Sequence, residues 1–188
     1  MTPMLITALT GFFAFNGMIG ISTDLRMKAE SSLSPEYPAY SVSMTGYNAV
    51  PEQTDSDPTT TASGAFSNAD IIAARSVDLA DELPFGTVIA VTAASSTPNC
   101  GIGLVDDLIG LRVIGDSMHA RMRNKIDILF DTKVTVRAKG KQMNPALVLG
   151  MCKNVQIEVV GHVDIKHMPK SQTELAAVFG LLKLTTDR

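Results

Sequence analysis

Two short apolar segments that carry Asp116 and Asp127 constrain the fold of this chain more than any other feature, and a polar, arginine-rich loop joins them. In the second segment, strict alternation separates Asp127 from three apolar residues that share the other face of a strand: Ile126, Ile128 and Phe130. Aspartate is depleted in strands because its carboxylate competes for backbone groups and is costly to bury. The segment is therefore either an edge strand with a solvated face or a strand that holds a carboxylate for a function.

The length and composition limit the classes of protein to consider. The chain has 188 residues, of which 45% are hydrophobic, and this suits one domain with a real core plus a leader. Its net charge is −3 and no basic stripe is evident in the sequence, so we expect no nucleic-acid partner.

Residues 4–21 form an uncharged run near the N-terminus. As a helix these eighteen residues would be about 27 Å long, close to the thickness of a bilayer core. We expect residues 1–22 to be a signal or membrane-anchor segment that directs export to the cell envelope, and residues 23–39 to be a linker. A buried core helix is the alternative. Arg26 and Lys28 follow the run instead of preceding it, and no Ala-x-Ala cleavage site is evident.

Six short apolar or alternating segments, with turns between them and few helices, predict a small β-barrel within residues 40–162. They are residues 41–45, 71–75, 87–92, 111–114, 126–130 and 155–160. A long Thr/Ser/Asp/Pro-rich loop at residues 47–64 is either functional or merely a solvated surface loop.

Two short helices complete the prediction. Asn144 is expected to cap the first, and Ser171 with Glu174 forms a capping box that opens the second. The second helix belongs to a C-terminal extension, residues 163–188. It carries an apolar stripe suited to packing on the barrel or on a partner: Leu175, Val178, Phe179 and Leu182.

Neither the cysteines nor the histidines match a known metal-ligand spacing. Cys100 and Cys152 are either two buried thiols or one disulfide, and we expect them to approach each other in the fold. His162, Asp164 and His167 match no compact ligand set. We therefore predict no metal and no cofactor.

Five pieces of the sequence together resemble the three-aspartate (3D) domain family. In order, they are Thr45-Gly-Tyr47, Thr61-Ala-Ser-Gly64, Pro84-Phe-Gly-Thr87, Asp116 and Ile126-Asp127. Their order and the eleven-residue gap between the last two aspartates carry the resemblance, which spans roughly residues 40–160. The family includes membrane-bound lytic transglycosylase A and stationary-phase survival and resuscitation-factor-like cell-wall proteins. The resemblance implies a mainly β fold, a six-stranded double-psi β-barrel.

Two departures from the family pattern concern the site. The family's first aspartate sits five residues before the turn proline, where this chain has Leu79, and neither Asp78 nor Asp81 is in register with it. The usual Asp-Thr-Gly-Gly loop is replaced by Asp-Ser-Met-His-Ala-Arg from Asp116 onward, and the loss of glycines changes how closely a sugar can approach.

The resemblance implies a lytic transglycosylase that acts on peptidoglycan glycan strands. Such an enzyme cleaves the β-1,4 bond after N-acetylmuramic acid without water, because the sugar's 6-hydroxyl attacks the anomeric carbon and closes a 1,6-anhydro ring. One carboxyl suffices as acid and then base, provided that burial or a neighbouring negative charge raises its pKa. The resemblance assigns this role to Asp127, while Asp116 tunes that pKa or binds substrate.

Two other functions remain open from the sequence. The altered first aspartate and the changed loop after Asp116 are compatible with a non-catalytic module that binds cell-wall glycan. Ordinary hydrolysis of a glucan would need a water-activating base, which the sequence does not locate.

Seven further residues are candidates for substrate binding. Tyr47 is either a stacking platform for sugar or a core residue, and the resemblance adds Thr61 and Gly64 from the loop motif. His119 is either a hydrogen-bond partner for a sugar hydroxyl or a surface residue. The cations between the two aspartates would contact lactyl or peptide carboxylates, or else form a solvated loop: Arg121, Arg123 and Lys125.

Overall fold

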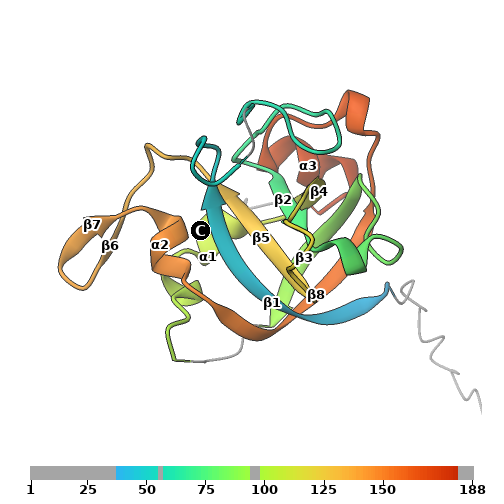
Figure 1. The fold of residues 1–188 in the computed structure, drawn as a ribbon. Coiled ribbons are helices and arrows are strands. Elements are labelled where there is room, and N and C mark those ends of the chain that lie inside the picture. The colour runs from blue at the N-terminus through green and yellow to red at the C-terminus, as the bar shows by residue number, and fades with distance from the viewer. Residues whose placement is uncertain (1–36, 55–56, 94–97, 182–188) are drawn as a thin grey trace, which may run out of the picture. The chain divides into compact units, whose positions relative to one another are not determined.

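The computed structural model describes residues 37–54, 57–93 and 98–181 and contains a closed six-stranded barrel (Figure 1). The barrel order is β1-β5-β2-β4-β3-β8. The strand bounds are β1 Ala39–Asn48, β2 Ile72–Arg75, β3 Thr87–Ala93, β4 Arg112–Ser117, β5 Lys125–Phe130 and β8 Cys152–His162. A two-stranded hairpin, β6 Val136–Ala138 and β7 Lys141–Met143, forms a separate sheet. The α-helices are α1 Asp106–Ile109, α2 Pro145–Leu149 and α3 Gln172–Val178, and the 3-10 helices are η1 Val77–Leu79, η2 Ile102–Leu104 and η3 Ile165–His167.

The predicted fold class is confirmed: the described chain is mainly β, with a six-stranded barrel, short helices and a C-terminal helix. The predicted start of the long loop was wrong. The long loop was expected to begin at Tyr47, but β1 continues to Asn48 because Tyr47 pairs with Leu129 of β5. The expected signal or anchor segment, residues 1–22, lies outside the described residues. Among the described residues, no helix is long and apolar enough to cross a membrane.

Strand β5 has a paired neighbour on each side, because the barrel is closed. It pairs in parallel with β1 on one side and antiparallel with β2 on the other. Strand β2 in turn pairs in parallel with β4. The structure therefore excludes the interpretation of Asp127 as a residue of a solvated edge strand.

Alternation along the strands builds two apolar clusters, one inside the barrel and one on its outer face. All six strands contribute to the inner cluster, which includes Ile126, Ile128 and Phe130, as predicted. The outer cluster draws on β1 to β5 and on α3, and its strand residues include Tyr47, Ile72, Ala74, Val88, Val113 and Leu129. Leu129 is completely buried there, so the face that β5 shares with Asp127 is covered over part of its length and not simply solvated.

The C-terminal helix α3 covers the outer cluster with part of its predicted stripe. Ser171 accepts a hydrogen bond from the Glu174 N–H at 3.2 Å, which is one half of the predicted capping box. The other half differs, because Glu174 Oε2 accepts the N–H of Lys170 at 2.7 Å and not that of Ser171. Leu175 is fully buried and Phe179 packs against the same cluster, but Val178 is 58% exposed. The predicted stripe was therefore wrong at Val178, the last residue of α3, and Leu182 lies outside the described residues.

A buried arginine connects the strands that carry the two aspartates. Arg112 is 1% exposed, and its guanidinium donates to backbone carbonyls from four parts of the fold: Leu108 and Ile109, Ala69, Ile72, and Leu129. Burial lowers the pKa of Arg112 to about 10, so the side chain keeps its charge at neutral pH. Because the fork of donors is planar and rigid, these bonds fix β4 relative to β2 and β5.

The two cysteines form a disulfide, which decides between the alternatives that the sequence left open. Cys100 and Cys152 have Cα atoms 4.7 Å apart and are separated by 52 residues. The bond ties the loop before η2 to the first residue of β8. Constraining a loop of this length stabilises a fold mainly by restricting the unfolded chain.

Candidate active site

The two aspartates lie on strands that flank β2, and both are opposite the same residue, Ala74. The register pairs Asp127 of β5 with Ala74, and Ala74 with Asp116 of β4. On the far side of β5, Asp127 pairs with Thr45 of β1. Adjacent strands are about 4.8 Å apart, so a single small side chain separates the two carboxylates across the sheet.

A bulge in β4 directs Asp116 to the outer face. From the inner residue Ile114, strict alternation would place Asp116 inside the barrel as well. The pairing instead skips Gly115, so that Ala73 pairs with Ile114 and Ala74 with Asp116. Bulges often re-aim a side chain in this way. The extra residue therefore brings Asp116 to the same face as Asp127.

Both carboxylates line one open cavity of about 580 Å³. Five predicted site residues contribute to its wall: Tyr47, Asp116, His119, Arg121 and Asp127. The other lining residues come from the loop after β1, from the loop before β2, and from β2, β4 and the β4–β5 loop: Glu52, Gln53, Thr54, Thr60, Ala62, Ser67, Ala74, Ser117, Met118 and Met122.

The surroundings of Asp127 raise its pKa. Burial raises the pKa of Asp127 from 3.8 to about 6. The hydrogen bond from Thr45 and the charge of Lys125 lower that pKa, and the charge of Asp116 raises it by the smallest of the four effects. The Thr45 hydroxyl donates to Oδ1 at 2.8 Å, and Oδ2 has no hydrogen bond within the described part of the chain. One oxygen is therefore positioned, and the other is free to carry a proton.

Asp116 has the opposite surroundings, because three donors converge on it. Oδ1 accepts the N–H of Ala62 at 2.9 Å and that of Ser117 at 2.8 Å. Oδ2 accepts the hydroxyl of Tyr47 at 2.9 Å. The carboxylate thus joins β1, β4 and the loop that precedes β2, and it organises one wall of the cavity.

Tyr47 lies in the outer cluster and is only 8% exposed. Its ring is packed among apolar residues, which fits the core alternative better than an open stacking platform. Burial and the Asp116 carboxylate raise the pKa of Tyr47 far above its usual value, so the phenol stays protonated and remains a donor to Asp116.

The loop motif at Thr61 and Gly64 lies beside the cavity but not in its wall. Thr61 Oγ1 donates to the Ala65 carbonyl at 3.1 Å and lies 3.0 Å from Ser63 Oγ. Gly64 has a φ of +82°, which glycine adopts without strain. Neither residue lines the cavity, but Thr60 and Ala62 beside Thr61 do.

The three cations between the aspartates differ in their contacts: Arg121 and Arg123 lie in the β4–β5 loop, and Lys125 is the first residue of β5. Arg121 lines the cavity together with His119, whose Nδ1 accepts the Arg121 N–H at 3.2 Å. Arg123 instead donates to the carbonyls of Ala120 and Met122. Lys125 lies outside the lining but acts on the site through its charge, which lowers the pKa of Asp127.

The family's first aspartate has no counterpart in the cavity. Leu79, at the matching position, is 8% exposed and belongs to the inner cluster. Asp78 is exposed in η1 and accepts the Asn124 N–H at 2.9 Å, where it holds the start of β5. The acidic residue that joins the two predicted aspartates in the wall is Glu52, on the loop after β1, which sequence reasoning missed.

Thr45, the hydrogen-bond partner of Asp127, was also missed as a site residue. The signal was present, because Thr45 opens the Thr-Gly-Tyr motif and shares a strand face with Tyr47 by alternation. Its partner was not visible, because the pairing of β1 with β5 spans 82 residues of sequence.

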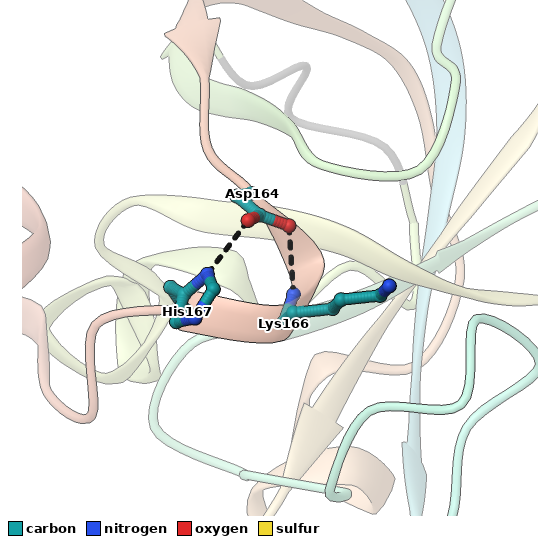
Figure 2. Close-up of polar contacts among 3 residues, drawn as sticks. All are labelled: Asp164, Lys166 and His167. Atoms are coloured by element: carbon teal, nitrogen blue, oxygen red, sulfur yellow. Dashed lines mark hydrogen bonds and ion pairs between the residues drawn. The ribbon is translucent and has the colours of Figure 1, made fainter.

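The histidine and aspartate after β8 form a local pair instead of a metal site. Figure 2 shows Asp164 between two partners: its Oδ2 lies 2.7 Å from His167 Nδ1, and its Oδ1 accepts the Lys166 N–H at 3.0 Å. The hydrogen bond to His167 lowers the pKa of this exposed carboxyl. In the described ranges, no group of three His, Cys, Asp or Glu residues is arranged to hold a metal ion.

Comparisons with known proteins add no family to this geometry. No protein-family model matches the chain, and no curated protein matches it. The resemblance to the three-aspartate domain therefore rests on the motif pieces, and the function is argued from the site.

Proposed function

We propose that this protein is a lytic transglycosylase-like enzyme that cleaves peptidoglycan glycan strands, with Asp127 as general acid and then general base. The observation that carries the proposal is the environment of Asp127, whose burial raises its pKa to about 6 in the wall of an open cavity. A carboxyl with this pKa is substantially protonated in mildly acidic solution and can also accept a proton back.

The proposed reaction needs one such group. The Oδ2 proton of Asp127 passes to the glycosidic oxygen as the bond from the anomeric carbon to that oxygen breaks. The 6-hydroxyl of the same N-acetylmuramic acid then attacks the anomeric carbon, and its proton returns to Asp127. The products are a 1,6-anhydro end and a free 4-hydroxyl, and the catalyst is restored to its starting state.

The surroundings of Asp116 support transglycosylation over hydrolysis. A hydrolase of the usual kind needs a second carboxylate as nucleophile or water-activating base. Asp116 accepts hydrogen bonds from Tyr47, Ala62 and Ser117, so three of the roughly four acceptor sites of a carboxylate are already engaged. Its negative charge still lies across Ala74 from Asp127, where it favours the positive charge that develops at the anomeric carbon.

Arg121 and His119 supply the proposed contacts to substrate beyond the reacting bond. Both line the cavity, and N-acetylmuramic acid carries a lactyl or peptide carboxylate that an arginine can bind. The proposal places the protein in the cell envelope, in keeping with the export expected from the uncharged run at residues 4–21.

One observation favours a second candidate, a glycan-binding module without catalysis. Leu79 replaces the family's first aspartate, and the described cavity has no carboxylate from η1 in its wall. A module of this kind would bind glycan strands through the same cavity and leave them intact.

Digestion of purified sacculi in ¹⁸O-labelled water separates these functions. A transglycosylase gives 1,6-anhydro products without ¹⁸O, because no water enters the product. A hydrolase gives reducing ends that contain one ¹⁸O atom, and a binding module gives no soluble products although it sediments with the sacculi. Either of the last two results would overturn the proposal.

A further inference from the structure

The charges of this protein are divided unevenly along the chain. Residues 132–157 contain five of the 16 Lys and Arg residues and none of the 19 Asp and Glu residues. The rest of the chain therefore holds eleven cations against nineteen acidic residues. The sequence did not suggest a basic stripe because the five cations are spaced apart: Lys133, Arg137, Lys139, Lys141 and Lys153.

Three of these cations, Arg137, Lys139 and Lys141, belong to the β6–β7 hairpin, which projects beside α2 (Figure 1). Lys133 lies three residues before β6, and Lys153 is the second residue of β8, which follows α2 in the chain. Lys139 and Gly140 form the tip of the hairpin, with φ values of +51° and +75°, as a two-residue type I′ turn requires. Asn144 Nδ2 donates to the Asp131 carbonyl at 3.3 Å, which closes the base of the hairpin. The hairpin is thus a held projection of the fold, with Ala138 buried and Val136 packed on the inner cluster.

All five cations are exposed and available for an external partner. Within the described ranges, the ion pair between Asp164 and His167 is the only one, so none of the five has a carboxylate within ion-pair distance. Three large apolar side chains in the same stretch of chain are also exposed: Leu147 of α2 is 70% exposed, Met151 44% and Val134 36%. Val134 precedes β6, Leu147 and Met151 follow β7 in and just after α2, and α2 packs beside β6.

We propose that this surface, made by the β6–β7 hairpin, Lys133, Val134, Leu147, Met151 and Lys153, docks the barrel on an anionic phospholipid surface. Cations next to exposed apolar side chains are the combination that binds the interface of an acidic bilayer. A soluble polyanion would use the cations but leave the apolar side chains exposed to water. The acidic remainder of the protein is repelled by the same surface, so the charge division also orients the molecule. This inference does not depend on the cleavage reaction proposed above.

The test is co-sedimentation of the full chain with vesicles of phosphatidylcholine alone or with about one-third phosphatidylglycerol. The expected result is stronger binding to the anionic vesicles, weakened by salt. The double variant Lys139→Asn and Lys141→Gln should lower the partition onto anionic vesicles by about 25-fold, at about fivefold for each cation. Asparagine tolerates the left-handed turn position, so the hairpin keeps its conformation.

A matched control removes two exposed cations elsewhere, through Lys166→Gln and Lys170→Gln, and should keep most of the anionic-vesicle binding. Leu147→Ser with Met151→Ser should weaken the binding that remains at high salt. Equal loss in the hairpin and control variants would overturn the proposal, since any two charges would then serve. The proposal would also be overturned if the protein bound soluble polyphosphate but not anionic vesicles. Equal binding to neutral and anionic vesicles, by both the wild type and the hairpin variant, would overturn it as well.

Discussion

Asp127 and Asp116 face the same alanine from opposite sides of β2, yet the regions around them differ in almost every respect. Asp127 lies in a regularly paired strand, and among the described residues it has one donor, on Oδ1, which leaves Oδ2 without a hydrogen bond there. Asp116 follows a bulge, has three donors and connects three segments of chain. The difference teaches that a carboxylate suited to move a proton is poorly solvated and has few hydrogen bonds, while its neighbour accepts three and holds the cavity wall together.

Asp127→Asn is the most severe test of the different roles assigned to the two aspartates. An amide donates no acidic proton and recovers none, so glycan cleavage should fall by about 10²- to 10⁴-fold. The amide oxygen can still accept the Thr45 hydroxyl, so the fold and glycan binding should persist. The measurement is release of anhydro products, with circular dichroism as the check on folding.

Asp78→Asn is the matched control for this variant, because Asp78 lies in η1 and outside the cavity lining. It should cleave glycan at close to the wild-type rate. Undiminished cleavage by Asp127→Asn would remove the proposed mechanism altogether.

Asp127→Asn should also change the free energy of unfolding in a pH-dependent way. The folded-state pKa of Asp127 is raised from 3.8 to about 6, so between these values the folded protein binds more protons than the unfolded chain. The contribution of Asp127 to the free energy of unfolding is therefore fully present below pH 3.8 and is lost as pH rises to about 6. The loss is on the order of 3 kcal/mol, at about 1.4 kcal/mol for each pKa unit.

Asp127→Asn lacks this ionisation, so relative to wild type it should gain stability as pH rises through that window and then level off. Urea unfolding of both proteins across the pH range measures the difference, because the other carboxyls are common to the two and cancel. A stability difference that does not change with pH would show that Asp127 is not buried as an acid.

Asp116→Asn should affect the stability of the cavity wall more than the pKa of Asp127. Three donors lose a carboxylate acceptor, and stability should fall by about 1–3 kcal/mol. The Asp116 charge is the smallest cause of the raised pKa of Asp127, so its removal should move the loss of cleavage only slightly toward lower pH. Cleavage should fall less than in Asp127→Asn.

A charge-matched control for this variant is Asp106→Asn, which removes an exposed carboxylate of α1 outside the site cavity. Its stability and pH profile should match wild type. If Asp116→Asn shifted the pH profile strongly while leaving stability intact, Asp116 would be a pKa-tuning group, which is one of the two roles that the resemblance implied.

The fold class and the orientation of Asp127 could be predicted from the sequence. Alternation in β5 placed Asp127 on one face of the strand and Ile126 and Ile128 on the other. The presence of both isoleucines in the inner cluster confirms this prediction. Local signals also identified the cap of α2, where Asn144 accepts the Ala146 N–H at 2.9 Å. These features succeed because each depends on residues a few positions apart.

The orientation of Asp116 and its hydrogen-bond partners could not be predicted, because they depend on pairings between distant segments of the chain. Alternation in β4 would put Asp116 inside the barrel, and the bulge at Gly115 reverses that orientation. The approach of Ala62 to Asp116 joins residues 54 positions apart, and that of Tyr47 joins residues 69 apart. No periodicity encodes such contacts. The projecting hairpin was missed for a different reason: its Lys139-Gly140 turn lacks the usual Asn-Gly or Asp-Gly signal.

Thr45→Val should give the smallest and most diagnostic effect. Valine has nearly the shape of threonine but lacks the hydroxyl that donates to Asp127 Oδ1 at 2.8 Å. That bond favours the ionised carboxylate and lowers the pKa of Asp127, so its loss should raise the pKa further. Cleavage, which falls as Asp127 loses its proton, should then persist to higher pH than in wild type, while its rate at low pH changes by only a few-fold because the acid itself remains. The measurement is the pH profile of anhydro-product release in wild type and variant. A profile displaced toward lower pH would mean that the hydroxyl stabilises the protonated acid, and the difference between the two carboxylates would have to be explained by burial alone.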